Sequence, residues 1–479
     1  MDPMTVMTAK EAEAVVNVKT SSMVKPAIMA HRQTMFLSNL DLGWLPINNV
    51  QRLFFYPQSP FNEYSSLIEG LKKSLSSVLV YFYPLAGRLK MGESGRLEVD
   101  CNDEGVEFRE ASINILFQDL EKDGFRRKPF FPKLVHEVDL SADETYTRPL
   151  LLIQFTAFEG GGICIGTTLH HVIADGNSFW HFMTSWAECS RGLPLSKPPQ
   201  HERTVFKRDN KSTLSISFKA HEIISNGIAG VKIFKFVSDN SQSDHINPCS
   251  RRNVEKPNEA LEKWVETKRK TEVIYSTFCF TEAMIQELKQ RSRASSSFVA
   301  VAAQFWRCAM RAREVPQEES VYFSLFGDCR VRVKPPLPPT YFGNCLCIGL
   351  AQTTANILIS TDISFAADVI QQLINSCTSE DQINYLIDWA DSPDRSFVKL
   401  FREAGWNYGT NAVSSPRFPL YEIDHGWAKP SDVQTATMNE IGIMFLSCAK
   451  DGGKSICVST CLPQHQMDIL NHLLFCSSQ

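Results

Sequence analysis

The residues best suited to chemistry are a histidine and an aspartate four positions apart within His170–Gly176, which reads HHVIADG. A neutral imidazole, whose ordinary pKa lies near ~6.5, can take a proton from a hydroxyl or an amine at cellular pH. Asp175 could orient the imidazole of His171, or it could pair with a cation and hold the loop. Spacing alone does not choose between these roles, and a histidine in an apolar strand can also be a core or capping residue.

The elements around this segment must present it at the edge of a sheet. Residues 163–169 are rich in β-branched side chains and follow three glycines at 160–162, which predicts a strand fed by a turn. Beyond Asp175, apolar residues recur at helical spacing, and Gly192 can end that helix. The stripe consists of Phe179, Phe182, Met183 and Trp186. A strand-to-loop-to-helix connection of this kind offers side chains to a ligand.

The pattern along the chain predicts two α/β domains of similar size. Strands at 51–56, 153–158 and 163–169 alternate with helices such as 64–81 in an N-terminal domain, residues 1–200. Polar and proline-containing stretches indicate a connector over 201–270, with a strand-like piece at 230–237 inside it.

The C-terminal domain is expected to span 271–479. Thr281 can cap a helix running to Arg291, and Ser295–Ser297 can cap a second helix with an apolar stripe. A β-hairpin is predicted over 442–462. Pro463 then opens a last helix, whose inward residues are Met467, Leu470 and Leu474.

Composition limits the class of protein. The 479 residues include 43% hydrophobic and 21% charged positions and carry a formal net charge of -4, which gives no electrostatic footprint for nucleic acid. The 14 cysteines are scattered through apolar segments and lack paired CxxC hooks, so we expect buried thiols and no metal site. No signal-peptide-like or membrane-spanning run is evident. We therefore expect a cytoplasmic monomer without membrane or nucleic-acid partners.

Four segments, taken in order, resemble one family. His171–Gly176 is similar to the HxxxDG motif of the plant BAHD acyltransferases, and Tyr83–Leu89 is similar to their YPLAGRL segment. Asp328–Cys345 resembles the family's DxRxRxxPPLPxxYFGNC block, and Asp424–Pro430 resembles its DFGWGKP motif. These anchors span most of the chain, so it is identified as a member of that family.

The last motif departs from the family at two positions. His425 stands where the family usually has phenylalanine, and Ala428 stands where it usually has glycine. Ala428 gives up the freedom to adopt positive φ, which puts the local loop geometry in question. His425 could be a titrating group or a polar packing substitute.

The resemblance implies two chloramphenicol-acetyltransferase-like domains, each a mixed β-sheet with flanking helices, joined by a long crossover with a solvent channel between them. It implies His171 as the catalytic base and a salt bridge from Asp175, for which Arg330 is the expected partner. Asp424, paired with an arginine that the sequence does not identify, is expected to support the site structurally, as are Gly426 and Trp427. By the same analogy Ser296 and Ser297 contact coenzyme A.

The implied reaction moves an acyl group from an acyl-coenzyme A thioester to a small-molecule alcohol or amine. A thioester is already electrophilic, so alignment, a base and oxyanion stabilisation suffice, without a covalent intermediate or a permanently bound cofactor. A condensation domain of a peptide synthetase shares HHxxxDG but should lack the Tyr341 and Asp424 blocks. The sequence also leaves open a non-catalytic binding protein and a family member with lyase chemistry.

Overall fold

The computed structural model of the chain describes residues 14–29, 32–45, 49–57, 64–136, 147–207, 215–222, 228–239, 272–389, 408–438 and 441–475. The chain forms two compact units. Unit 1 comprises Met1–Val205, Pro338–Asn344 and Pro419–Thr437, and unit 2 comprises Phe206–Leu337, Cys345–Phe418 and Met438–Gln479.

Unit 1 is built on a six-stranded sheet in the order β1-β6-β7-β8-β3-β15. Its strands are β1 (Val16–Val24), β3 (Asn49–Tyr56), β6 (Val106–Leu116), β7 (Leu151–Glu159), β8 (Ile163–His170) and β15 (Asp432–Gln434). The β6–β7 pair is parallel and the other neighbours are antiparallel, so the sheet is mixed. All eight residues of β8 are buried, including the polar residues Thr167, Thr168 and His170.

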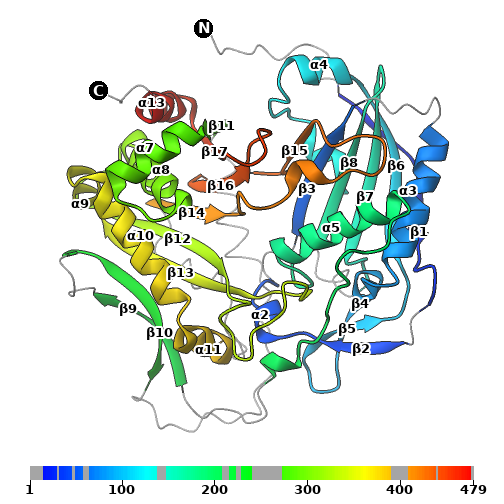
Figure 1. Ribbon diagram of the computed structural model, residues 1–479, viewed down its shortest axis with the longest axis horizontal. Coiled ribbons are helices and arrows are strands. Elements are labelled where there is room, and N and C mark those ends of the chain that lie inside the picture. Colours follow the sequence, from blue (N-terminus) through cyan, green and yellow to red (C-terminus); the bar gives the residue numbers. More distant parts are fainter. Residues whose placement is uncertain are drawn as a thin grey trace. The chain divides into compact units, whose positions relative to one another are not determined.

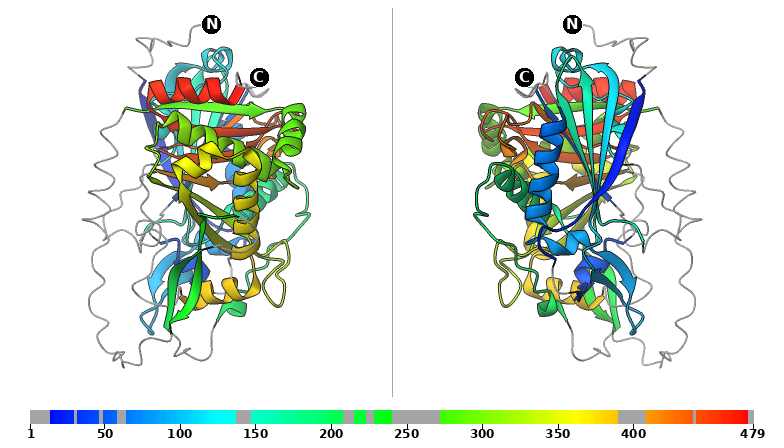
Figure 2. Two further views of the ribbon diagram at one scale, coloured as in Figure 1. Left: turned by 90° about the vertical axis from the view of Figure 1, so that its left-hand side faces the viewer. Right: turned by 90° about the vertical axis from the view of Figure 1, so that its right-hand side faces the viewer.

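Two long helices, α3 (Tyr64–Val78) and α5 (Gly176–Ser190), lie on one side of this sheet and pack against each other (Figure 1). Trp186 of α5 donates from Nε1 to the hydroxyl of Ser74 in α3 at 3.1 Å. The right-hand view of Figure 2 shows α3, in blue, alongside the strands. The unit also contains the short helices α2 (Asn39–Leu42) and α4 (Phe117–Lys122), and a small antiparallel sheet formed by β2 (Gln33–Phe36), β5 (Leu97–Cys101) and β4 (Arg88–Met91).

Unit 2 is built on an eight-stranded mixed sheet in the order β11-β17-β16-β14-β12-β13-β10-β9. Its strands are β9 (Ser215–Glu222), β10 (Lys232–Asp239), β11 (Ile274–Phe280), β12 (Ser320–Asp328), β13 (Leu346–Thr354), β14 (Gly409–Val413), β16 (Ile443–Cys448) and β17 (Ile456–Leu462). The helices α7, α10 and α13 pack around α8, whose inward face is almost entirely apolar (Figure 1). The helices are α7 (Glu282–Ser292), α8 (Ser297–Ala312), α9 (Ala355–Ser360), α10 (Ile363–Cys377), α11 (Glu380–Trp389) and α13 (Gln464–Phe475).

The structure confirms the local predictions in both units. Helix α5 follows Asp175, and α3 covers most of the expected 64–81 segment. Thr281 caps α7, and Ser296 caps α8. The C-terminal hairpin is the antiparallel pair β16–β17, and the three expected inward residues of the last helix are buried in α13.

The unit boundaries differ from the contiguous ranges 1–200, 201–270 and 271–479. Residues 338–344 and 419–437 belong to unit 1. The first segment is bound to Ser178 and Asp41, and the second contains β15, which pairs with β3 at the edge of the six-stranded sheet. The expected connector contains β9 and β10, which join the eight-stranded sheet through β13. The strand-like piece at 230–237 is therefore β10, and residues 240–271 of the connector lie outside the described part of the chain.

One prediction about cysteines is wrong. Cys279 and Cys457, opposite each other on β11 and β17, form a disulfide, whereas the sequence predicted free thiols throughout. The pair escaped notice because 178 positions separate the two residues in the sequence. The other cysteines in the described segments are not disulfide-bonded, and most are buried. None of the helices in those segments is long and apolar enough to cross a membrane.

Candidate active site

His171 lies one residue beyond the end of β8, where the chain turns towards α5. The turn is closed by the backbone amide of Ile173, which donates to the carbonyl of His170 at 3.1 Å. Asp175 is the N-cap of α5, and its carboxylate accepts from the amide of Ser178 at 3.0 Å. A capping side chain of this kind fixes the entry of the chain into the helix, so it also fixes the loop that carries His171.

The imidazole of His171 stacks on the indole of Trp44. The ring centroids are 4.1 Å apart and the planes differ by 5°. Burial lowers the pKa of His171 to about 4, and its own carbonyl, the charge of Asp175 and the side chain of Asn344 oppose that shift. The imidazole is therefore neutral at neutral pH and has a lone pair available.

The neighbouring His170 is part of the core. It is 1% exposed, its amide donates to the carbonyl of Leu150 at 2.9 Å, and its Nδ1 accepts from the amide of Val172 at 3.3 Å. Burial lowers the pKa of His170 to about 3. Of the two adjacent histidines, only His171 is partly exposed.

Asn344 links the backbone of His171 to a buried carboxylate. Its Nδ2 donates to the carbonyl oxygen of His171 at 2.9 Å and to Oδ1 of Asp41 at 3.0 Å. The backbone amide of Asn344 donates to the same carboxylate oxygen at 2.9 Å. The other oxygen of Asp41 accepts from the amide and hydroxyl of Ser38, which forms a capping box with it at the start of α2.

Arg203 completes this network as the cation opposite Asp41. Its Nη1 lies 3.0 Å from Oδ2 of Asp41, and both side chains are almost fully buried. Its Nη2 donates to the carbonyls of Ile173 at 2.8 Å and Phe342 at 3.0 Å. One guanidinium thus ties α2, the loop after His171 and the 338–344 segment together.

The first turn of α5 is bound to the same 338–344 segment. The hydroxyl of Ser178 donates to the carbonyl of Gly343 at 2.9 Å, and the amide of Gly343 lies 3.0 Å from that hydroxyl. Ser178 is 1% exposed, so these contacts are shielded from water. The segment therefore holds both the helix that Asp175 caps and the carbonyl of His171.

Several residues of this network were missed by sequence reasoning. No role was predicted for Trp44, Asp41 or Arg203, and Asn344 stood out only as part of a family block. A partial signal existed for Asp41, because Ser38 and Asp41 have the spacing of a capping box. Arg203 offers no comparable pattern, since its partners are brought to it only by the tertiary fold.

Arg330, which was predicted to pair with Asp175, lies next to Asp328. Arg330 is 2% exposed, and its Nη1 lies 3.1 Å from a carboxylate oxygen of Asp328, whose Oδ1 also accepts from the amide of Arg330 at 3.0 Å. Asp175 belongs to unit 1 and Arg330 to unit 2, so the salt bridge between them stays a prediction.

The Asp424 motif is a turn beside an aromatic cluster. Asp424 accepts from the amide of Gly426 at 2.8 Å, and its expected pairing with an arginine stays a prediction. Gly426 has φ +105°, a conformation that disfavours any side chain. Trp427 stacks on His425, with ring centroids 5.5 Å apart, and also contacts Tyr56 of β3.

His425 fills the phenylalanine position as a packing residue. It is 3% exposed, and burial lowers its pKa to about 3. Its Nδ1 lies 2.9 Å from the hydroxyl of Ser190 in α5, and its ring also meets that of Trp186 edge to face. The structure therefore favours polar packing over titration near neutral pH.

The two serines expected to contact coenzyme A start α8. The hydroxyl of Ser296 accepts from the amide of Val299 at 3.2 Å, and Ser297 is the first helical residue. Capping is thus their observed role, and coenzyme A contact stays a prediction. Within the described residues, no group of three or more histidine, cysteine or acidic side chains could hold a metal ion.

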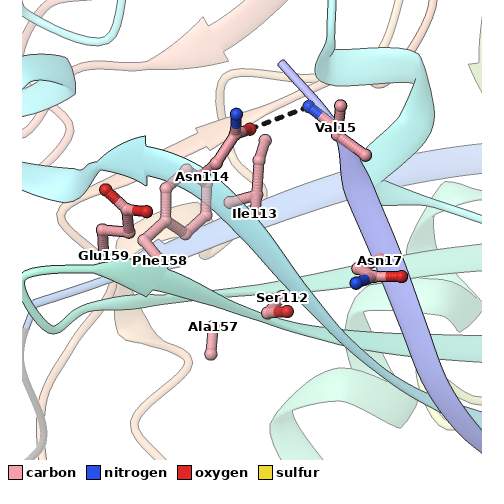
Figure 3. Close-up of a pocket in the computed structure, with 8 residues that line it drawn as sticks. All are labelled: Val15, Asn17, Ser112, Ile113, Asn114, Ala157, Phe158 and Glu159. Carbon is pink, nitrogen blue, oxygen red and sulfur yellow. Dashed lines mark hydrogen bonds between the residues drawn. The ribbon is translucent and has the colours of Figure 1, made fainter. Parts of the chain in front are cut away.

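A shallow groove of about 370 Å³ lies elsewhere in unit 1, between β1, β6 and β7 (Figure 3). It is lined by Val15, Asn17, Ser112, Ile113, Asn114, Ala157, Phe158 and Glu159. The amide of Val15 donates to Oδ1 of Asn114 at 2.8 Å across it. Glu159 ends β7 beside the start of β8, so the groove and His171 lie at opposite ends of these strands.

Solved structures define the class of fold. The chain is similar to vinorine synthase, with a TM-score of 0.68, 19% identity and coverage of 96% of this chain and 98% of that one. It is equally similar to TRI101 of F. graminearum, with a TM-score of 0.68, 15% identity and coverage of 91% and 96%. Both therefore share this fold of mixed sheets with flanking helices.

Sequence comparison then places the chain in a family. A family model described as "Transferase family" matches residues 14–473. A BAHD acyltransferase of Arabidopsis thaliana named DCR is 30% identical over 482 residues, covering 95% of this chain and 91% of that protein. A hydroxycinnamoyltransferase of Narcissus pseudonarcissus is 28% identical over 471 residues, covering 96% and 99%. The chain belongs to the BAHD acyltransferases, as the sequence motifs predicted.

Proposed function

We propose that the protein moves an acyl group from a coenzyme A thioester to the hydroxyl or amine of a plant specialised metabolite, with His171 as the general base. The observation that carries the proposal is that His171 is partly exposed and has a neutral imidazole. The imidazole stacks on Trp44, and the backbone carbonyl of His171 accepts from Asn344. The solved structure of TRI101 with ethyl coenzyme A, which shares the fold, supports a thioester donor. Several relatives are named for hydroxycinnamoyl transfer, so we propose a hydroxycinnamoyl donor as the first to test.

The proton steps follow from the two ring nitrogens. Nδ1 is buried, which leaves Nε2 of His171 to face the acceptor. Nε2 takes the proton of the acceptor as its oxygen or nitrogen attacks the thioester carbonyl. The carbon–sulfur bond then breaks, and the proton passes to the departing sulfur, giving free coenzyme A and the ester or amide in a ternary complex without an acyl-enzyme.

The proposed base depends on its surroundings in two ways. Burial keeps His171 unprotonated before the reaction, and the negative charge of Asp175 stabilises the imidazolium formed during it. Asp175 acts at a distance, because its carboxylate caps α5 rather than binding the ring. It is therefore a positioning residue, and catalysis rests on His171.

The test measures release of coenzyme A thiol from a panel of acyl-coenzyme A donors with a plant extract as the source of acceptor. We expect acceptor-dependent release by the unmodified protein and a loss of about 10²- to 10⁴-fold in His171→Ala. His465→Ala, which removes an exposed imidazole of α13, is the control and should retain full activity. Circular dichroism checks that both variants are folded.

Two other outcomes would redirect the interpretation. Undiminished release in folded His171→Ala would rule out the general base. Absence of release with every donor would favour a non-catalytic small-molecule-binding protein or, if an acceptor is consumed without coenzyme A, a lyase.

A further inference from the structure

Packing contributes to the orientation of the His171 ring, whose polar contacts are with its own backbone and with the side chain of Asn344. Within the described segments its Nδ1 has no partner at hydrogen-bonding geometry, although the atom is buried. Asn344 donates to the backbone carbonyl of His171 and its side chain also interacts with the imidazole, while Asp175 caps α5. Rotation about the bond that carries the imidazole is therefore restrained by packing against Trp44 as well as by these polar contacts.

Trp44 supplies a flat surface for that purpose. Its indole lies parallel to the imidazole within 5°, and its side chain is 4% exposed. Stacked aromatic rings attract each other and resist tilting out of the common plane. A tilt of the imidazole would drive its edge into the indole, so the stack confines Nε2 to one plane.

Trp44 is itself fixed by the network described above. Its amide donates to the backbone carbonyl of Asp41 at 3.1 Å, directly after α2. The carboxylate of Asp41 is bound by Asn344 and Arg203, so the backbone that carries the indole and the carbonyl of His171 share one anchor. The backbone positions of both stacked residues, Trp44 and His171, are thus fixed through Asp41 and Asn344.

We propose that Trp44 is a positioning residue for acyl transfer, whose indole face sets the plane of the His171 imidazole and so aims Nε2 at the acceptor. This inference rests on the proposed function and adds a residue that acts only through His171. Because Trp44 is only 4% exposed, we expect its loss to lower kcat and to leave KM for donor and acceptor nearly unchanged.

The same contact shields the imidazole from water. The charged groups that act on His171 are Asp175, which favours its protonated form, and Arg52 of β3, which disfavours it, while burial is the largest influence on its pKa. Removing the indole opens the ring to solvent, which should raise the pKa of His171 from about 4 towards its ordinary value. The acid limb of the kcat/KM profile should then move to higher pH.

Three substitutions separate the flat face from simple space filling. Trp44→Leu removes the face while keeping much of the volume, and Trp44→Phe keeps a flat ring. Trp180→Leu removes a buried tryptophan of α5 whose indole meets Phe54 and Phe179 edge to face. We expect kcat to fall by up to about 10²-fold in Trp44→Leu, because small misplacements of a reacting group have effects of that size. Trp44→Phe should recover most of the loss.

The readouts are kcat, KM and the pH profile of each folded variant, with His171→Ala in the same assay. Loss of kcat in Trp44→Leu with KM unchanged, an upward shift of the acid limb and rescue by phenylalanine would support the proposal. Equal kcat and pH profiles in wild type and Trp44→Leu would overturn it while leaving the base assignment intact, as would an equal loss in Trp180→Leu. A wild-type chain that transfers no acyl group would overturn both.

Discussion

Replacing Asp41 with asparagine would remove the negative charge that pairs with Arg203 in the buried network around His171. The substitution keeps the shape of the side chain, and its carbonyl oxygen can still accept from Asn344. The lost contacts are the 3.0 Å ion pair between Oδ2 of Asp41 and Nη1 of Arg203, both almost fully excluded from water, and the hydrogen bonds that the same oxygen accepts from the amide and hydroxyl of Ser38. Asp41→Asn therefore leaves a guanidinium buried without its counter-charge.

Asp41→Asn is expected to lower the free energy of unfolding substantially, although it replaces only one oxygen by an amino group. Removing one partner of a buried ion pair destabilises a protein by about 3–5 kcal/mol. Arg203 keeps its bonds to the carbonyls of Ile173 and Phe342, which are neutral and do not replace a charge. Since native domains are stable by about 5–15 kcal/mol, this loss would be readily visible.

Urea unfolding followed by circular dichroism measures the free energy of unfolding. The matched control is Glu422→Gln, which breaks the pair of Glu422 with Lys429, an ion pair of the same unit whose side chains are more than half exposed. Exposed pairs contribute about 0–1 kcal/mol, so this variant should unfold close to wild type. The double variant Asp41→Asn/Arg203→Met should be less destabilised than the sum of the single variants, because neither charge is then left alone.

Two results would refute this reasoning. An effect of Asp41→Asn no larger than that of Glu422→Gln would show that the pair is not the buried anchor described here. Strict additivity in the double variant would show that the two side chains do not interact.

The remaining predictions concern charge, packing and covalent links. Burial lowers the pKa of His425 to about 3, below the ~6.5 of an unfolded imidazole, so the unfolded chain binds more protons and stability falls as pH drops from about 6.5 towards 3. His425→Phe should reduce that pH slope by up to about 1.4 kcal/mol per pH unit, measured by urea unfolding from pH 7 to 5, and an unchanged slope would contradict it. Reduction of the Cys279–Cys457 disulfide should lower the unfolding free energy by about 2–4 kcal/mol, because it closes a long loop. Dithiothreitol should then lower the melting temperature of wild type but not that of Cys279→Ser/Cys457→Ser.

Local structure was largely predictable because its signals are local. The apolar spacing and the capping residue of α8 lie within one stretch of sequence, as do the turn and alternation of the β16–β17 hairpin. His171 and Asp175 stood out for the same reason, since strand, loop and helix are consecutive. Four motifs in order were enough to identify the family.

The network that holds His171 could not be predicted from one sequence. Asn344 lies 303 positions from Asp41 and 173 positions from His171, and a single chain carries no signal of which distant residues meet. The stack on Trp44 has the same origin, because an isolated tryptophan in an apolar stretch predicts only burial. The disulfide between Cys279 and Cys457 was missed for the same reason, because the two residues are 178 positions apart in the sequence.

The discontinuity of unit 1 has a consequence for how the protein is made. Strand β3 pairs with β8 on one side and with β15 on the other, and β15 leaves the ribosome only after residue 432 has been added. At translation rates of about 5–20 residues per second, the edge of β3 stays uncovered for roughly 10–45 s after residue 205 is synthesised. During that interval Asp41 also lacks Asn344, so a nascent chain carries an exposed strand edge and an incomplete site together. Fragments that end near residue 205 should therefore aggregate rather than fold, and any attempt to express unit 1 alone must include residues 338–344 and 419–437.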